Sequence, residues 1–178
     1  MKSAIKNMVR LLKIGLFGRL RVAKKQGLKC GNNVTVMGGV NFGSEPYLIS
    51  LGDNVRISSD VLFVTHDGGS WVFRREGKFK DVVRFGRINI GSNVFIGARS
   101  VILPGVRIGN NCVVAAGCVV TKSFPDGSVI AGVPGRVISD IDTYALKMKS
   151  RMPNDWDSEQ LLKNKRSYLE GKIPNEGC

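Results

Sequence analysis

The sequence lacks several features that define common protein classes. None of its apolar runs approaches the roughly 20 residues of a membrane-spanning helix. The four cysteines form no C-x-x-C pair, so their spacing gives no metal signal and is most simply that of free thiols in the cytosol. Arg10 and Lys13 interrupt the apolar N-terminal stretch and no small-residue cleavage site follows it, so we expect no secretion signal. These absences favour a cytoplasmic protein.

Histidine and acidic residues are also scarce. The 178 residues include one histidine, His66, and 14 Asp and Glu against 27 Lys and Arg, for a net charge of +13. Nine of the cations precede the first acid, Glu45. Such an excess implies an anionic partner: nucleic acid, a lipid surface, an acidic glycan or a polyphosphate cofactor. Because no nucleic-acid-binding motif appears, and the nine cations lie largely outside the repeat described next, we expect no nucleic-acid partner.

An internal repeat dominates the middle of the chain. Four related strings, "GNNV", "GDNV", "GSNV" and "GNNC", start at Gly31, Gly52, Gly91 and Gly109, with spacings of 21, 39 and 18 residues. Aliphatic or aromatic residues recur every six positions, and most in the later part are followed by a small residue. These positions are Val36, Phe42, Leu51, Ile57, Phe63, Ile90, Ile96, Ile102, Ile108, Val114 and Val120.

A period of six excludes a helix, whose period is 3.6 residues. It fits short strands that alternate inward and outward residues and are separated by turns at Gly and Asn, which tolerate positive φ. Three strands per coil give a triangular stack with parallel pairing between coils. The 21-residue spacing then holds a three-residue insert, "PYL" at 46–48, and the 39-residue spacing holds a 21-residue insert at 67–87. A meander or sandwich would instead place its turns 8–12 residues apart.

Three stretches resemble a known family: the hexads over 88–123, "GVPGRVI" at 132–138 and "VTHD" at 64–67. They are similar to the hexapeptide-repeat acyltransferases, and the resemblance covers roughly residues 28–140. It implies a mainly β fold, a left-handed parallel β-helix, although general rules favour right-handed crossovers. The nearest subgroup comprises acetyl-CoA-dependent O-acetyltransferases acting on sugars, including enzymes of polysaccharide biosynthesis. These are homotrimers without a metal, and their active sites lie in clefts between subunits.

We expect three regions in this single-domain chain. Residues 1–27 form a basic helical cap, residues 28–138 form the catalytic β-helix with an excursion loop at about 67–87, and residues 139–178 form a helical tail. The apolar face over residues 3–20 either covers the open end of the β-helix or docks to the inner face of an anionic membrane. In the tail we expect helices over 139–150 and over 157–170, the second ending at Gly171.

The resemblance assigns roles to individual residues. His66 is the general base that takes a proton from the acceptor hydroxyl, a role suited to imidazole at neutral pH. The insert at 67–87 would leave the coil after His66 and form one wall of a cleft around this histidine. The backbone N–H of Ala98 would lie near the thioester, and Ala116 would line the pantetheine path. The resemblance also assigns Thr121, Lys122 and Arg136 to acetyl-CoA binding, and these positions are called the acetyl-CoA corner.

Lys122 and Arg136 suit phosphate contacts, although both could be part of a solvated basic face. A further arginine of the family is replaced here by Ser139. Three residues are weaker candidates for acceptor binding. Asp67 either orients His66 or caps a turn, Trp71 and its neighbour Phe73 either stack on a sugar or pack on another subunit, and Asn41 lies where some relatives bind the acceptor.

The sequence favours O-acetylation of a sugar or glycan hydroxyl. N-acetylation of an amino-sugar needs the same base and donor and stays open. A zinc-dependent carbonic anhydrase on this fold needs three histidines and is excluded by the single His66. A non-catalytic β-helix protein is disfavoured, because both the histidine motif and the acetyl-CoA corner are present.

Overall fold

The structure is a computed structural model that describes residues 18–173. The chain divides into two compact units, Met1–Asp142 and Thr143–Cys178. No helix in the described part of the chain is long and apolar enough to cross a membrane.

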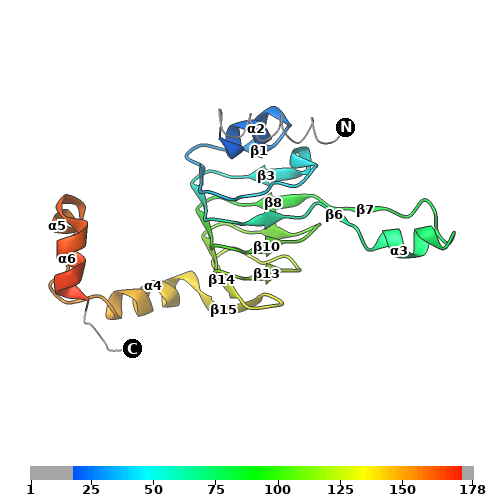
Figure 1. The fold of residues 1–178 in the computed structure, drawn as a ribbon. Coiled ribbons are helices and arrows are strands. Elements are labelled where there is room, and N and C mark those ends of the chain that lie inside the picture. Colours follow the sequence, from blue (N-terminus) through cyan, green and yellow to red (C-terminus); the bar gives the residue numbers. More distant parts are fainter. Residues whose placement is uncertain (1–17, 174–178) are drawn as a thin grey trace. The chain divides into compact units, whose positions relative to one another are not determined.

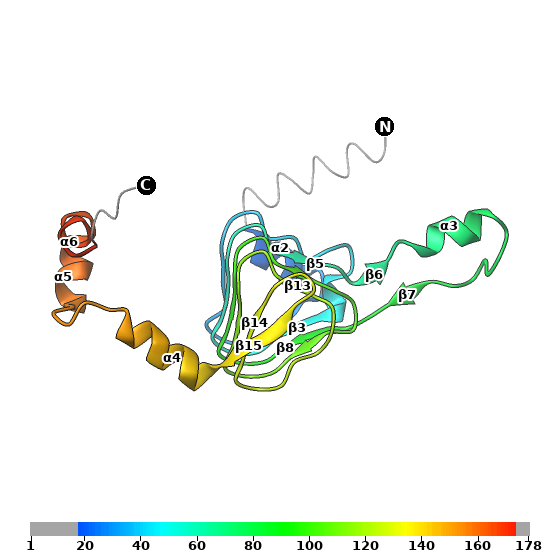
Figure 2. The same cartoon turned by 90° about the horizontal axis from the view of Figure 1, so that it is seen from below.

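The first unit is a stack of short strands in three sheets (Figure 1). Viewed along the stack, the coils have a triangular outline (Figure 2). One sheet contains β1 (Lys29–Cys30), β3 (Ile49–Leu51), β8 (Ile88–Ile90) and β11 (Arg107–Ile108). The second contains β2 (Thr35–Val36), β4 (Val55–Ile57), β9 (Val94–Ile96), β12 (Cys112–Val114), β14 (Ser128–Ala131) and β15 (Arg136–Asp140). The third, called the short sheet below, contains β5 (Leu62–Phe63), β10 (Val101–Ile102) and β13 (Val119–Val120).

The strand register follows the predicted repeat. Lys29 pairs with Ser50, Ser50 with Asn89 and Asn89 with Arg107, all in parallel. These steps reproduce the spacings of 21, 39 and 18 residues between the G-x-N strings. Within the stack, as far as the structure describes the chain, only β15 runs antiparallel to its neighbour, β14, and this pair ends the stack.

The G-x-N strings form one corner of every coil. The asparagine at the third position of each string has a positive φ between 51° and 57°. Asn33 donates its side-chain amide to Asn54, and Asn93 donates to Asn111, each at 2.8 Å. Asparagine therefore provides both the left-handed turn and a polar ladder along the corner.

The predicted inward positions form the core. Ten of the eleven residues listed for the six-residue period are no more than 5% exposed, and Val36 is partly buried against the same cluster. At the N-terminal end, α2 (Arg19–Lys25) packs Ala23 into this core, and an Arg19 guanidinium nitrogen donates to the carbonyl of Val40 at 3.2 Å. This helix covers the end of the stack, whereas the predicted segment over residues 3–20 lies almost entirely outside the described residues.

Both predicted inserts leave the coil at one corner. The first forms a 3-10 turn, η1 (Pro46–Leu48). The second, predicted as an excursion loop, projects from the stack as an arm that contains β6 (His66–Asp67), α3 (Ser70–Arg75) and β7 (Arg84–Phe85) (Figures 1 and 2). Antiparallel pairing of β6 with β7 supplies the hydrogen bonds that the interrupted coil cannot.

The tail differs from the prediction at its boundaries. Its first helix, α4 (Ile141–Ser150), begins after residues 139–140, which belong to β15. The predicted second helix is broken at Asn164 into α5 (Ser158–Lys163) and α6 (Lys165–Lys172), and Gly171 lies inside α6. Asp157 caps α5 by accepting hydrogen bonds from the N–H groups of Glu159 and Gln160.

Candidate active site

His66 stands at the corner where the short sheet ends. The same corner of the preceding coil carries Glu45, and Leu103 and Thr121 follow the strands of the next two coils. Stacking therefore aligns residues that are far apart in the sequence. Each corner residue is about 4.8 Å from its neighbour along the stack, the usual spacing between paired strands.

A carboxylate holds the histidine. Nδ1 of His66 lies 3.0 Å from Oε2 of Glu45, and the Thr65 hydroxyl donates to the same oxygen at 2.5 Å. The Glu45 side chain is only 15% exposed, whereas that of His66 is 42% exposed. The partly buried acid thus lies behind the imidazole, which remains accessible from the solvent side.

The protonation of this pair follows from its contacts. Burial on its own raises the pKa of the Glu45 carboxyl, but hydrogen bonds from Thr65, His66 and Ser44 outweigh it and hold that pKa below the ordinary value of 4.5. Glu45 is therefore a carboxylate at neutral pH and can only accept hydrogen bonds. Nδ1 of His66 must carry the proton of their contact, which leaves Nε2 as the basic nitrogen of the neutral ring.

His66 lines a cleft of about 300 Å³ at the base of the arm. The His66 and Phe85 rings lie 5.7 Å apart across the β6–β7 ribbon. Of the predicted site residues, the structure brings His66, Asp67 and Thr121 together here. The full lining is Val64, His66, Asp67, Gly68, Arg84, Leu103, Pro104 and Thr121.

Ala98 and Ala116 lie at the other end of the short sheet. They occupy the same corner of consecutive coils, and the N–H of Gly117 donates to the Ala98 carbonyl at 2.8 Å. The buried Ser100 hydroxyl ties this corner together by donating to the carbonyls of Gly97 and Ala115. Within the described residues the N–H groups of Ala98 and Ala116 have no hydrogen-bond partner, so both are available to a ligand.

The two predicted phosphate contacts are exposed and do not line the cleft. Nζ of Lys122 lies 5.9 Å from the centre of the Phe124 ring. The exposed Arg136 guanidinium donates to the carbonyls of Gly135 at 2.9 Å and Pro134 at 3.5 Å. Ser139, at the position of the missing family arginine, pairs with Val129 inside the β14–β15 ladder.

The weaker acceptor candidates make local contacts within the chain. The Asn41 side chain accepts from the N–H of Gly43 at 3.0 Å, and the Asp67 carboxylate accepts from the N–H of Gly69 at 2.8 Å. Asp67 thus caps a turn, and the side chain that contacts His66 is Glu45. Trp71 is 61% exposed on the arm, under the Arg75 guanidinium, and lies outside the cleft lining.

Sequence reasoning missed Glu45. One signal was available, because Glu45 is the first acid of the chain and directly precedes the "PYL" insert. A lone acid beside an insertion at a corner shared with His66 indicates a partner for that histidine. The pairing itself depends on the register between two coils, which the repeat spacing predicts only approximately at an insert.

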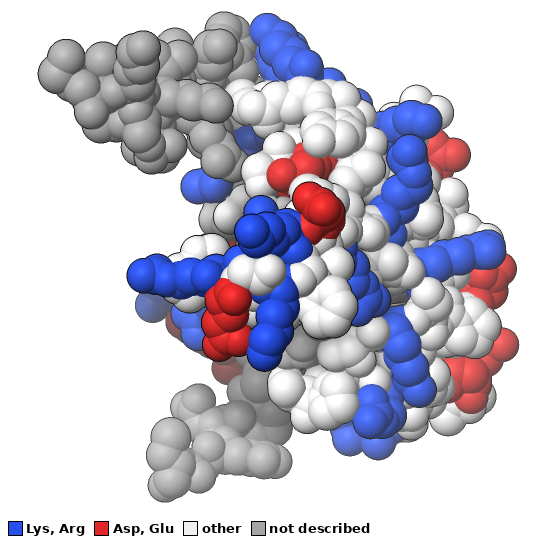
Figure 3. Space-filling model, turned by 90° about the vertical axis from the view of Figure 1, so that its right-hand side faces the viewer, with Lys and Arg blue, Asp and Glu red and all other residues white. Residues whose placement is uncertain are grey.

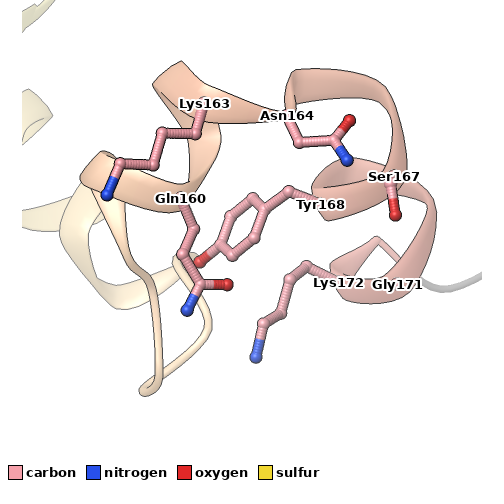
Figure 4. A pocket seen from close by; sticks show the side chains of 7 residues that line it. All are labelled: Gln160, Lys163, Asn164, Ser167, Tyr168, Gly171 and Lys172. Atoms are coloured by element: carbon pink, nitrogen blue, oxygen red, sulfur yellow. The ribbon is translucent and has the colours of Figure 1, made fainter.

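A second hollow lies in the C-terminal unit, between α5 and α6 (Figure 4). Its two lysines already have partners: Lys163 contacts Glu159 at 2.6 Å, and Lys172 contacts Asp155. None of the predicted site residues lies there. Residues 18–173 contain no group of three or more His, Cys, Asp or Glu side chains placed to hold a metal ion. The cleft at His66 is therefore the candidate active site.

Comparison with known proteins places the chain in a family. The family model described as "Hexapeptide repeat of succinyl-transferase" matches residues 87–122. Protein CapG of Staphylococcus aureus is 46% identical over 152 residues, which cover 84% of this chain and 86% of CapG. The chain belongs to the hexapeptide-repeat acetyltransferases. It is therefore an acyltransferase.

Two other members of the family are similar over part of the chain. The galactoside O-acetyltransferase of Escherichia coli K12 is 43% identical over 99 residues, covering 55% of this chain and 47% of the relative. A hexapeptide-repeat acetyltransferase of Vibrio cholerae O1 biovar eltor, solved in complex with acetyl-CoA, is 26% identical with a TM-score of 0.57. That match covers 73% of this chain and 82% of the Vibrio chain.

Proposed function

We propose that this protein is an acetyl-CoA-dependent O-acetyltransferase that acts on a sugar or glycan hydroxyl, in the biosynthesis of a surface polysaccharide. The observation that carries the proposal is the hydrogen bond between Glu45 and His66 at the cleft, because it prepares a base for a hydroxyl proton. The named activity of the E. coli relative supports a sugar acceptor, and the Vibrio complex supports acetyl-CoA as the donor.

The chemistry divides between two groups of residues. Nε2 of His66 takes the proton of the acceptor hydroxyl as its oxygen attacks the thioester carbon. Glu45 stabilises the imidazolium that forms, as a carboxylate can do across one hydrogen bond. An N–H at the Ala98 corner donates to the oxyanion of the tetrahedral intermediate. The intermediate then expels the CoA thiolate, which receives the proton from His66, and the acetyl ester leaves.

One copy of the chain does not bring these two groups together. The His66 corner and the Ala98 corner are the two ends of the short sheet, five residues apart along one coil, as between Ala98 and Leu103. At a rise of about 3.3 Å per residue this separation is on the order of 15 Å, too far for a thioester at Ala98 to meet His66. We therefore propose a shared cleft, with the base from one copy and the thioester site from its neighbour.

A homotrimer of left-handed β-helices, formed by residues 28–138, supplies such clefts. The outward residues of the short sheet support an interface at this face, because Leu62, Val101 and Val119 stack in register as a half-exposed apolar stripe. The arm supports it too, since Trp71 and Phe79 are 61% and 71% exposed. Acetyl-CoA would then run from His66 past Ala116 and Thr121, with its phosphates at Lys122 and Arg136.

The test is an assay of the full chain with acetyl-CoA and a panel of sugars, read by mass spectrometry of the products and by release of the CoA thiol. We expect acetyl esters on at least one sugar hydroxyl. Products acetylated only on nitrogen of amino-sugars would move the activity to N-acetylation. Absence of any acetylated sugar, with acetyl-CoA bound normally, would overturn the proposal.

A further inference from the structure

The cleft contains a cation that the acetyl-transfer chemistry does not use. Arg84, on β7 of the arm, lines the cleft together with His66. Of the lining residues it is the only one whose side chain is positively charged at every relevant pH. Its guanidinium makes no ion pair or hydrogen bond to another side chain in the part of the chain that the structure describes.

Asp67 is the acidic residue placed to pair with Arg84, but its carboxylate accepts a hydrogen bond elsewhere. Asp67 lies directly opposite Arg84 in the β6–β7 ribbon, where side chains of paired residues project to the same side. The Asp67 carboxylate instead accepts a hydrogen bond from the N–H of Gly69 at 2.8 Å and forms no ion pair with Arg84. The N–H groups of the guanidinium are therefore available to a ligand that enters the cleft.

The side of the molecule that carries the arm is rich in cations (Figure 3). The arm alone has six Lys and Arg against three acids over residues 67–87. Two of the other cations have partners on the arm, Arg75 over the Trp71 ring and Lys78 beside Glu76. Such a field raises the local concentration of an anionic ligand and speeds its encounter with the cleft.

The donor does not supply the anion at this position. Thr121 and Lys122 lie two coils along the stack from the base of the arm, about 10 Å at the spacing of paired strands. A donor that places its uncharged thioester near His66 and its phosphates at Lys122 presents no charge to Arg84. The charge must belong to the acceptor.

We propose that Arg84 is a specificity-determining residue for an acceptor that carries an oxyanion group, a carboxylate or a phosphate, close to the hydroxyl that is acetylated. The inference rests on the proposed function and narrows its substrate class to acidic sugars. Arginine suits this task, because its planar fork can hold a carboxylate or phosphate through two parallel hydrogen bonds.

The experiment compares matched neutral and charged acceptors, galactose against galacturonic acid and glucose against glucose 1-phosphate. The wild type should prefer the charged member of at least one pair, and which pair shows the preference separates a uronic acid from a sugar phosphate. Arg84→Ala should raise the KM for that acceptor by about 10- to 100-fold, the loss expected for a charge-assisted hydrogen bond. The KM for acetyl-CoA should stay unchanged, and Arg84→Lys should restore part of the affinity.

Arg74→Ala is the matched control, since Arg74 is an arm cation outside the cleft lining. Equal use of neutral and charged sugars by the wild type would overturn the inference and leave the proposed function standing. An equal loss of kcat on both acceptors would assign Arg84 to the reaction's oxyanion, and a raised KM for acetyl-CoA would assign it to the donor. Absence of acetyl transfer to every sugar would reject the proposed function and this inference together.

Discussion

Glu45 and His66 are 21 residues apart in the sequence but occupy the same corner of consecutive coils, where a 3.0 Å hydrogen bond joins them. The coil that carries Glu45 is lengthened at this corner by η1, and the coil that carries His66 is lengthened by the arm. Both inserts therefore lie at the corner where a partly buried acid contacts an accessible base. The repeat provides the scaffold, and its two interruptions provide the site.

Replacing His66 with alanine tests the base. The side chain is 42% exposed and lies outside the core cluster, so His66→Ala should fold, with its denaturation midpoint lowered only by the loss of the contact with Glu45. Acetyl transfer should fall by roughly 10²- to 10⁴-fold, the usual contribution of a general base. Turnover near that of the wild type, with acetyl-CoA still bound, would exclude the mechanism proposed above.

Replacing Glu45 with glutamine tests the positioning of that base. Glu45→Gln keeps the size and the acceptor oxygen but removes the charge that stabilises the imidazolium. We expect kcat to fall by about 10- to 100-fold, the equivalent of one charge-assisted hydrogen bond, with the KM for acetyl-CoA unchanged. Thr65→Val removes another donor to the same carboxylate and should cause a smaller loss. A Glu45→Gln variant as active as the wild type would show that the carboxylate is only structural.

The same substitution should change how stability depends on pH. The pKa of Glu45 is lower in the folded chain than its ordinary value of 4.5, so its ionised form stabilises the fold. This contribution is fully present above pH 4.5 and is lost as the pH falls through the lower pKa of the folded state. Urea titrations at fixed protein concentration should show the gap between wild type and Glu45→Gln shrinking below pH 4.5. A gap that widened on acidification would contradict the assigned direction.

Much of this fold could be predicted from the sequence, because one six-residue period determines the strand register and the inward positions. The spacings of 21, 39 and 18 residues reappear as the strand register, and Ile57, Ile96 and Val114 are buried as the period requires. The helical boundaries were less predictable. Asn164 interrupts the last predicted helix with a backbone conformation of φ −147° and ψ 68°. Helix propensity along the sequence does not predict this break.

The site was predictable only where its chemistry is carried by a rare residue. His66 stands out as the sole histidine, whereas Glu45 and Arg84 become neighbours of the cleft through register and through the path of the arm. Asp67 adjoins His66 in sequence, but its carboxylate accepts a hydrogen bond from the N–H of Gly69, and no contact joins it to the imidazole in the described residues. The sequence left two roles open for Asp67, orienting His66 or capping a turn, and neither pointed to Glu45.

Removing charges at Lys122 and Arg136 tests the path of the donor. Lys122→Ala and Arg136→Ala should each weaken acetyl-CoA more than a truncated pantetheine thioester that lacks the nucleotide. The expected difference is roughly 1.5–3 kcal/mol per contact, typical of hydrogen bonds to charged groups. Arg56→Ala, an exposed cation on β4, should affect neither donor. Equal losses on both donors would place the phosphate site elsewhere.

The proposed shared cleft requires that copies of the chain associate. Light scattering at micromolar concentration should give about three times the 19.4 kDa chain mass. Val101→Glu, at the centre of the apolar stripe on the short sheet, should reduce the mass toward that of one chain and abolish turnover, because charge is costly in an apolar interface. Asn89→Glu on β8 should leave the assembly intact. A wild-type monomer would reject the shared cleft.

Gly97, next to Ala98, allows a test of the proposed thioester site. A Cβ on Gly97 would lie 2.4 Å from the backbone nitrogen of Ala116, so Gly97→Ala must push consecutive coils apart between the two N–H groups assigned to the donor. Gly91→Ala causes a similar clash at the asparagine corner, where a Cβ would lie 2.7 Å from Gly109. Gly38 has nothing within 4 Å of its added Cβ.

These three variants separate stability from function. Gly97→Ala and Gly91→Ala should each cost about 1–3 kcal/mol of unfolding free energy, as overpacking does, and Gly38→Ala should stay within about 0.5 kcal/mol of the wild type. Only Gly97→Ala should also lower acetyl transfer, by up to about 100-fold, because a displacement near 1 Å spoils the alignment of the thioester. If Gly91→Ala lost as much activity at equal stability, the loss would come from the stack as a whole, and the donor would not depend on the Ala98 corner.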